Sequence, residues 1–383
     1  MSAEEDGRVE FFRHSVGEEE IRAVAEAMRG PFLTRGKLVE AFEKELAEYL
    51  ECKPLALGVS SCTAALHLAL LALEVSQGDE VITTPMTFIA TANVILHCGA
   101  TPVFVDVEPA TGLIDLTAVE AAISPRTKAV IAVHLYGQMA DVVRLRAICD
   151  ARGIALIEDA AHATDAIRDG VRPGQLGDAA AFSFYATKNI TSGEGGALVM
   201  RDPARFERAR MLHQHGMSAS AADRHSGAYR HWDMLALGYK YNMTNLQAAM
   251  LRPQLHRIDA LRAARERLAS RYEDALTGLS GIEFPRSVPA ATSARHLFTM
   301  WAPDGRRDAY LAGLNARGIG TAVNYRAVHL LTYYRERFGF DRGAYPVAEA
   351  IGDRTLSLPL FPSMTLEEQD RVIEAVRDVH RVG

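Results

Sequence analysis

A strand, a helix and a second strand follow one another in 128-KAVIAVHLYGQMADVVRLRAICDARGIALIEDA-160. The outer runs, 128–137 and 154–160, are almost wholly apolar, whereas 141–153 has the spacing of an amphipathic helix. Parallel strands carry such near-continuous apolar runs because helices cover both faces of their sheet. The stretch therefore predicts an α/β fold with a parallel sheet, in which ligands bind beyond the carboxyl ends of the strands.

The same alternation extends from about residue 55 to residue 200. Further strand-like runs lie at 80–85, 102–107, 180–185 and 197–200, and helical segments lie at 63–75, 88–99 and 116–123. Two helices precede this region, at 15–30, with Ser15 and Glu18 as a capping box and Gly30 as the C-cap, and at 37–50.

The pattern changes after about residue 201. A long helix is predicted over 244–276, with a kink at Pro253, and 277–383 has the short strands and helices of a smaller α+β domain. A chain of 383 residues is too long for one compact core. We therefore expect a large domain over 1–250 and a small C-terminal domain over 251–383.

Composition excludes several classes of function. A net charge of −6 offers no basic field for nucleic acid or an anionic membrane, and no apolar run reaches membrane-spanning length. The acidic N-terminus lacks the apolar core of a signal peptide, and the four cysteines, Cys52, Cys62, Cys98 and Cys149, form no CxxC pair. These features predict a cytoplasmic protein. His213 and His215 lack a companion ligand cluster, so we expect no metal.

Two segments could bind a ligand. In 58-GVSSCTAALHLAL-70, small hydroxyl residues lead into an apolar helix, either as an ordinary N-cap or as a phosphate site built from free amides and the Thr63 hydroxyl. Asp159 ends an apolar strand and either caps the next helix or faces a ligand. His162, one turn on, is either a packed histidine or a ligand contact.

Phe88 and Lys188 complete the set of candidates. Phe88 follows a strand end, where an aromatic is either core or a platform for a flat ring. Lys188, in 183-SFYATKNITSGEGG-196, is either a solvated lysine or an amine whose burial suits it to carbonyl chemistry. A phosphate cradle, an aromatic platform, an Asp at a strand end and a lysine together are the set that pyridoxal phosphate requires.

With these residues in view, the chain resembles the DegT/DnrJ/EryC1/StrS aminotransferases, the sugar aminotransferases of fold type I. The resemblance runs nearly end to end. It is carried by 32-FLTRGKLVEAFEKEL-46, 60-SSCTAALHLAL-70, 84-TPMTFIATAN-93, 157-IEDAAHA-163, 183-SFYATKNITSGEGGALV-199, 237-LGYKYNMTNLQAAM-250, 325-YRAVHL-330 and 356-LSLPLFPSMT-365.

The resemblance implies a role for each candidate residue. Lys188 carries pyridoxal phosphate as a Schiff base and then moves protons, while Asp159 pairs with the pyridine nitrogen. The remaining cofactor contacts are Phe88 on the ring, His162 beside its 3-hydroxyl, and Cys62, Thr63 and Ser183 at the phosphate, with Asn242 reaching the phosphate of the neighbouring subunit. Tyr325 and His329 line the sugar-nucleotide side. Two positions depart from the family: Cys62 stands where glycine is usual, and Asn324 where many members have histidine.

The resemblance also implies a reaction and its partners. Glutamate or glutamine converts pyridoxal phosphate to pyridoxamine phosphate, and a homodimer with shared active sites passes the amine to a nucleotide-linked keto sugar. The segments 213–218 and 237–250 look most like members that act at C4, here of a UDP- or dTDP-linked 4-keto-6-deoxy sugar. Three alternatives stay open: amination at C3 or of a keto-cyclitol, a non-catalytic sensor that kept the fold, and a lyase or desulfurase acting on an amino acid.

Overall fold

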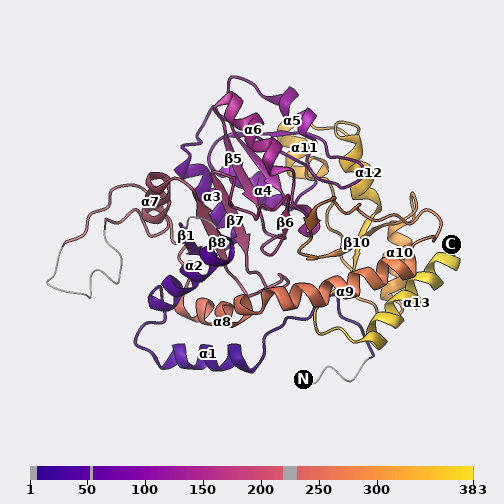
Figure 1. Ribbon diagram of the computed structural model, residues 1–383. Coiled ribbons are helices and arrows are strands. Elements are labelled where there is room, and N and C mark those ends of the chain that lie inside the picture. Colours follow the sequence, from indigo (N-terminus) through magenta and orange to yellow (C-terminus); the bar gives the residue numbers. More distant parts are fainter. Residues whose placement is uncertain (1–6, 52–54, 219–230, 383) are drawn as a thin grey trace.

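The computed structural model describes residues 7–51, 55–218 and 231–382 of the chain, so Cys52 lies outside the described residues. Its centre is a seven-stranded sheet in the order β1-β8-β7-β5-β4-β2-β3 (Figure 1). The strands are β1 (Ala56–Val59), β2 (Glu80–Thr83), β3 (Thr101–Phe104), β4 (Thr127–Val133), β5 (Ala155–Asp159), β7 (Ala179–Ser183) and β8 (Gly196–Met200). The strands from β7 to β3 pair in parallel, and β8 pairs antiparallel with both β7 and β1. The predicted α/β fold with a mostly parallel sheet is confirmed.

Helices cover both faces of this sheet. They are α2 (Lys37–Tyr49), α3 (Cys62–Ala72), α4 (Ile89–His97), α5 (Leu116–Ala122), α6 (Val142–Arg152), α7 (Pro203–Leu212), α8 (Asn245–His256) and α9 (Ile258–Leu276). Outside this layer, α1 (Glu18–Arg29) packs against α8. Successive strand residues point to opposite faces. In β7, for example, Ala179 and Ala181 pack with α3 and α7, whereas Ala180 and Phe182 pack with α2 and α8. The near-continuous apolar strands are the direct consequence of this double burial.

A smaller layer follows at the C-terminal end. It contains β10 (Phe298–Trp301) paired antiparallel with β11 (Thr355–Leu358), together with α10 (Arg307–Asn315), α11 (Thr332–Phe338), α12 (Pro346–Arg354) and α13 (Leu366–Val382). One apolar core joins β10 and β11 to α10, α13, the C-terminal half of α9 and Val9 from the other end of the chain. In Figure 1, α8 and α9 run along the base of the molecule from beneath the large sheet to α10 and α13. The predicted division after residue 250 falls inside α8 and stays a prediction.

Two predicted helix boundaries are wrong. The first helix begins at Glu18, not at Ser15, because the carboxylate of Glu20 accepts the Gly17 amide at 2.7 Å and the backbone of Gly17 is extended. The long helix is two helices that meet at Arg257 (φ −116°), four residues beyond the predicted kink. Pro253 removes one main-chain donor, yet α8 continues past it.

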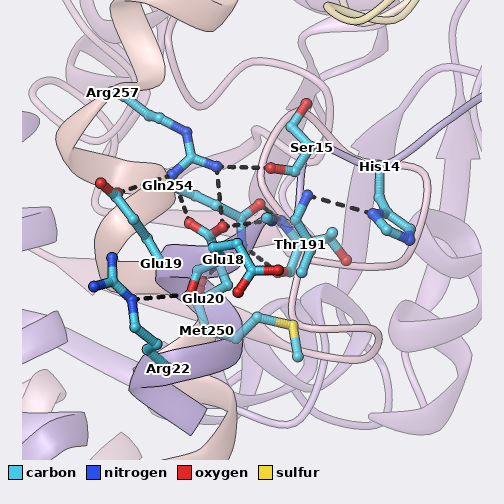
Figure 2. A network of polar contacts seen from close by, with 12 residues as sticks. His14, Ser15, Glu18, Glu19, Glu20, Arg22, Thr191, Met250, Gln254 and Arg257 are labelled. Atoms are coloured by element: carbon cyan, nitrogen blue, oxygen red, sulfur yellow. Dashed lines mark hydrogen bonds and ion pairs between the residues drawn. The ribbon is translucent and has the colours of Figure 1, made fainter.

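The Arg257 side chain, at the junction of the two helices, contacts the segment that leads into α1. It donates to Glu20 at 2.6 and 3.1 Å and to the Ser15 carbonyl at 2.7 Å, as Figure 2 shows. These bonds hold α1 against the α8–α9 junction.

In the described part of the chain, no helix is long and apolar enough to cross a bilayer.

Candidate active site

Asp159 ends β5 at the carboxyl edge of the sheet, with only 6% of its surface exposed. Thr91 Oγ1 donates to its Oδ2 at 2.7 Å, the Ala161 amide donates to its Oδ1 at 3.2 Å, and Cys62 Sγ lies 3.9 Å from Oδ1. Thr91 sits one helical turn into α4, so it reaches the strand end from the side of the sheet that α4 covers. The carboxylate is thus held at a strand end, where the sequence predicted a ligand-facing group.

The residue before Asp159 anchors the end of the strand. Glu158 is fully buried, accepts the amides of Gly174 at 3.0 Å and Gly177 at 2.9 Å, and lies 2.8 Å from His134 Nε2. Because His134 Nδ1 accepts the Ala140 amide at 3.2 Å, the imidazole proton is on Nε2, which donates to Glu158. The Glu158 carboxylate and both His134 ring nitrogens have hydrogen-bond partners, so they are not available to a ligand. They hold the end of β5 and thereby orient Asp159.

Lys188 lies in the loop between β7 and β8, where its amide donates to the Tyr185 carbonyl at 2.9 Å. Burial lowers the pKa of the Lys188 amine to about 8, although the nearby Cys62 and Asp159 side chains act in the opposite direction. Roughly a tenth of the amine is therefore neutral at pH 7, far more than for an exposed lysine. Such an amine can act as a nucleophile or a base.

The lysine loop is fixed from below by α8. Gln254, which is fully buried, accepts the Thr191 amide at 3.0 Å and donates to the Thr191 carbonyl at 2.8 Å (Figure 2). Both main-chain groups of Thr191 are therefore satisfied by one side chain. This pairing sets the depth at which the loop presents Lys188 to the sheet edge.

Free main-chain amides lie where β1 leads into α3, at the predicted phosphate site. Ser61 is the N-cap, and its Oγ accepts the Ala64 amide at 3.1 Å, which leaves the amides of Cys62 and Thr63 without intrahelical acceptors. Ser183 pairs in the sheet with Gly196, and a Cβ on Gly196 would come within 2.4 Å of the Ser61 carbonyl carbon. The starts of α3 and β8 therefore pack closely, which only a glycine at position 196 permits, and Ser183 at the end of β7 lies beside them.

Asn242 and Cys62 also lie at the predicted phosphate site. Asn242 forms a bridge with Val59 and donates from Nδ2 to the Met243 carbonyl at 3.2 Å, while its Oδ1 is buried without a partner among the described residues. Burial raises the pKa of the Cys62 thiol well above its usual range, so this cysteine stays protonated. A desulfurase needs a reactive thiolate, and Cys62 is not one.

Aromatic side chains line the other side of the site. Phe88 is the N-cap of α4 and is 55% exposed, unusual for a residue whose type is normally buried. Its ring centroid lies 5.9 Å from that of Tyr325, whose hydroxyl is 3.0 Å from His162 Nε2. His162 Nδ1 is buried and has no partner in the part of the chain that the structure describes. Burial and the Lys188 charge hold the pKa of His162 well below its usual value, so the ring is neutral.

His329 is not brought to this cluster. It is fully buried in a short 3-10 helix, with Nε2 on Glu349 Oε1 at 2.9 Å and its ring 4.7 Å from that of Tyr345. The other nine predicted residues lie at this edge of the sheet, at strand ends, at helix starts and in loops, or contact a residue there. They are Cys62, Thr63, Phe88, Asp159, His162, Ser183, Lys188, Asn242 and Tyr325.

Three site residues were not predicted from the sequence: Thr91, Asn189 and His296. Thr91 has a signal in hindsight, because it follows Phe88 by three residues and so shares its helix face. His296, whose Nε2 is 3.4 Å from Lys188 Nζ, has none, since its segment follows α9 and is remote in sequence.

The donors present fit pyridoxal phosphate. Asp159 supplies a buried anion, Lys188 an amine, α3 a turn of free amides, Phe88 an exposed ring, and His162 an unpaired buried nitrogen.

Within residues 7–51, 55–218 and 231–382, no three His, Cys, Asp or Glu side chains form a group that could hold a metal. A groove of about 1140 Å³ between α1, α2 and α8 is lined by neither Lys188 nor Asp159.

Comparison with known proteins points the same way. The model of the DegT/DnrJ/EryC1/StrS aminotransferase family matches residues 14–377. The chain is 43% identical over 371 residues to the spore coat polysaccharide biosynthesis protein SpsC of Bacillus subtilis, covering 95% of both chains. Its fold is similar to the putative sugar aminotransferase Spr1654 from Streptococcus pneumoniae in its PMP form (TM-score 0.92, 31% identity, 98% of this chain and 99% of that one). It is also similar to DesV of S. venezuelae (TM-score 0.89, 38% identity, 97% and 98%).

Proposed function

This chain belongs to the DegT/DnrJ/EryC1/StrS aminotransferase family, and from that premise we propose how its site is used and on what substrate. The protein is a pyridoxal-phosphate-dependent sugar aminotransferase. We infer that glutamate or glutamine supplies the amino group and that a nucleotide-linked keto sugar accepts it. The single observation that carries this proposal is the placement of the Lys188 amine near the buried Asp159 carboxylate at the carboxyl edge of the sheet, where burial lowers the pKa of the lysine.

Each group around the site has a defined task toward the cofactor. Asp159 would keep a proton on the pyridine nitrogen, and the amides of Cys62 and Thr63 with Ser183 would hold the phosphate. Phe88 would stack on the ring, and His162 Nδ1 would meet its 3-hydroxyl. When bound, pyridoxal phosphate supplies an electron sink for the carbon that loses a proton.

Lys188 is the group that moves protons. Its Nζ would take the α-proton of the amino donor and later deliver a proton to the sugar carbon that receives the amine. A base near the working pH does both well, because it is neither too weak to accept nor too strong to release. Burial, which lowers the pKa of Lys188 to about 8, brings it to that range.

A second copy of the chain would complete each site. The Asn242 side chain has a buried oxygen without a partner among the described residues. Two exposed apolar residues lie close by: Leu237 (79% exposed) is five residues earlier in the chain, and the carbonyl of Leu33 (49% exposed) accepts the Asn245 amide. We propose a homodimer in which Asn242 binds the phosphate of the partner's cofactor. Tyr325 and His329 are the proposed sugar-nucleotide side, with Tyr325 in direct contact and His329 supporting its loop from the core.

For the acceptor, we propose amination at C4 of a UDP- or dTDP-linked 4-keto-6-deoxy sugar. Support comes from the segments 213–218 and 237–250 and from SpsC, whose name refers to a spore coat polysaccharide. The product would be an amino sugar for a polysaccharide. The proposal places the reaction in the cytoplasm, where nucleotide sugars are available.

The test is an absorbance spectrum of the purified protein before and after glutamate is added. We expect a visible band from the lysine-bound cofactor that converts to the shorter-wavelength pyridoxamine form. Lys188→Ala should bind the cofactor without the lysine-linked band and should not convert. A protein that stays colourless with added pyridoxal phosphate would refute the proposal in favour of a non-catalytic sensor.

A second experiment addresses the acceptor. The pyridoxamine form is mixed with a panel of UDP- and dTDP-linked 4-keto and 3-keto sugars, and the product is assigned by NMR. Return of the visible band with an amine at C4 is expected. An amine at C3, or reaction with a keto-cyclitol alone, would overturn the C4 assignment and leave the aminotransferase activity in place.

A further inference from the structure

A chain of buried polar groups leads from Lys188 away from the proposed cofactor. Lys188 Nζ lies 3.4 Å from His296 Nε2, and His296 Nδ1 lies 3.2 Å from Asn189 Oδ1. Asn189 Nδ2 contacts Asp165 Oδ1 at 2.9 Å, and Asp165 Oδ2 contacts Arg265 at 2.5 Å. Asp165, Arg265 and His296 are each less than a tenth exposed, whereas Lys188 and Asn189 are half-buried.

The acceptors of Asn189 Nδ2 determine which group donates in each hydrogen bond between Asn189, His296 and Lys188. Asn189 Nδ2 faces the Asp165 carboxylate and the Ala294 carbonyl, both at 2.9 Å, and these oxygens can only accept. The Asn189 amide therefore cannot be flipped, and its Oδ1 faces His296. An amide oxygen accepts, so His296 carries its proton on Nδ1 and presents the lone pair of Nε2 to the Lys188 amine.

A proton shared between Lys188 and His296 resides on the lysine. Burial and the Lys188 charge hold the pKa of His296 well below its usual value, whereas the pKa of Lys188 is about 8. His296 is thus a fixed acceptor and does not store the proton. The amine can rotate about the final bond of its side chain, and one of its hydrogens is directed at His296.

The imidazole is held in place from α9. Arg295, next to it, pairs with Glu266 at 2.9 Å and Glu273 at 2.8 Å. The Ala294 carbonyl also accepts Arg265 Nε at 3.1 Å. The segment 294–296 is therefore pinned to a long helix that crosses from the large sheet to the C-terminal layer (Figure 1).

We propose that His296 is a positioning residue for Lys188, and that Asn189, fixed by Asp165 and Arg265, keeps His296 in the tautomer that accepts from Nζ. This inference rests on the proposed function, because it assigns a means of aiming the amine to the lysine of that reaction. The two ends of this hydrogen-bonded series come from the β7–β8 loop and from α9, so the orientation of the amine depends on how α9 packs against the large sheet.

The test compares two isosteric substitutions. In His296→Gln the side-chain carbonyl can take the place of Nε2 and accept from Lys188. In His296→Asn the shorter amide takes the place of Nδ1, keeps the bond to Asn189 and does not reach the lysine. Urea unfolding of both variants controls for loss of structure.

Two quantities are measured for each variant. One is the rate at which pyridoxal phosphate becomes attached to Lys188 in the cofactor-free protein, which needs a neutral amine and releases one water. The other is the glutamate half-reaction, with ordinary and α-deuterated glutamate. For His296→Asn we expect both rates to fall about a hundredfold, as for a reacting group misplaced by about an ångström, with a larger deuterium isotope effect. His296→Gln should stay within about fivefold of wild type.

The outcomes separate this inference from the proposed function. Equal rates and equal isotope effects for His296→Asn, His296→Gln and wild type would overturn the positioning role alone. Equal losses in both variants, with an unchanged isotope effect, would also overturn it, since a packing defect gives that result. If wild type itself fails to bind the cofactor or to convert with glutamate, the proposed function is refuted first.

Discussion

Gly196→Ala tests the proposed phosphate site directly. Gly196 begins β8 and pairs with Val59 on one side and Ser183 on the other. An added Cβ would lie 2.4 Å from the Ser61 carbonyl carbon and 2.6 Å from the Cys62 nitrogen. Non-bonded carbon atoms prefer separations of about 3.5–4.0 Å, so the β1–α3 junction would have to retreat by about 1 Å.

The retreat has two consequences of calculable size. Overpacking at a backbone contact should lower the free energy of unfolding by about 1–3 kcal/mol. It should also move the Cys62 and Thr63 amides off the phosphate. Loss of one hydrogen bond to a charged group costs about 1.5–3 kcal/mol, which raises the Kd for pyridoxal phosphate about 10- to 150-fold.

Both effects are measured on the same preparation. Cofactor-free protein is titrated with pyridoxal phosphate by absorbance, and unfolding is followed in urea. The matched control is Gly153→Ala, at the end of α6, where φ is +64° but nothing lies within 4 Å of the added Cβ. The control should lose about 1 kcal/mol of stability through backbone strain and keep the wild-type Kd.

The comparison has a clear adverse result. If Gly196→Ala binds the cofactor with the wild-type Kd and unfolds at the wild-type midpoint, the α3 amides do not form the phosphate site. A loss of stability alone, matching that of Gly153→Ala with no change in Kd, would also contradict the assignment. In either case the close contact between Gly196 and Ser61 would be packing only.

Three further predictions concern charge at the site. Asp159→Asn should lower turnover by at least about a hundred- to a thousandfold, because a neutral amide cannot balance the protonated pyridine nitrogen, while the urea midpoint stays near wild type; normal turnover would exclude the role. Arg265→Met should lower the free energy of unfolding by about 3–5 kcal/mol, because it strands the buried Asp165 carboxylate, and the double variant with Asp165→Leu should recover part of the loss in the same urea assay. In wild-type cofactor-free protein, the rate at which pyridoxal phosphate attaches to Lys188 should rise with pH and level off above about pH 8, because burial lowers the pKa of Lys188 and only the neutral Nζ attacks. A pH–rate midpoint near the pKa of an exposed lysine would contradict the burial argument.

The predicted elements agree with the structure where local pattern decides them. The strands at 128–137, 154–160 and 180–185 are β4, β5 and β7, because unbroken apolar runs can be accommodated only in a sheet covered on both faces. Errors occur at ends. β1 (Ala56–Val59) is absent from the predicted strands, and the long predicted helix divides at Arg257, whose side chain binds Glu20, a residue remote in sequence.

Site residues at strand ends were predictable for a physical reason. In a parallel sheet the carboxyl ends of neighbouring strands meet at one edge, so Asp159 and Ser183, which end β5 and β7, lie at the same edge once these strands are recognised. His329 shows the limit of this reasoning. It follows Tyr325 by four residues, yet its side chain turns into the core and bonds Glu349. Whether a side chain faces a site or a core depends on packing partners elsewhere in the chain.

The sequence by itself determined the sheet, the strand ends and the chemistry available there, because hydrophobic periodicity and helix capping are local properties of the chain. Only the tertiary structure decided how the Lys188 amine is aimed. His296 lies 108 residues away along the chain and reaches the lysine through the packing of α9 and the Asp165–Arg265 pair. Contacts of that kind leave no periodic trace in a sequence, since they depend on how two separately formed layers dock. The lysine is a feature of the sequence, and the orientation of its amine is a feature of the fold.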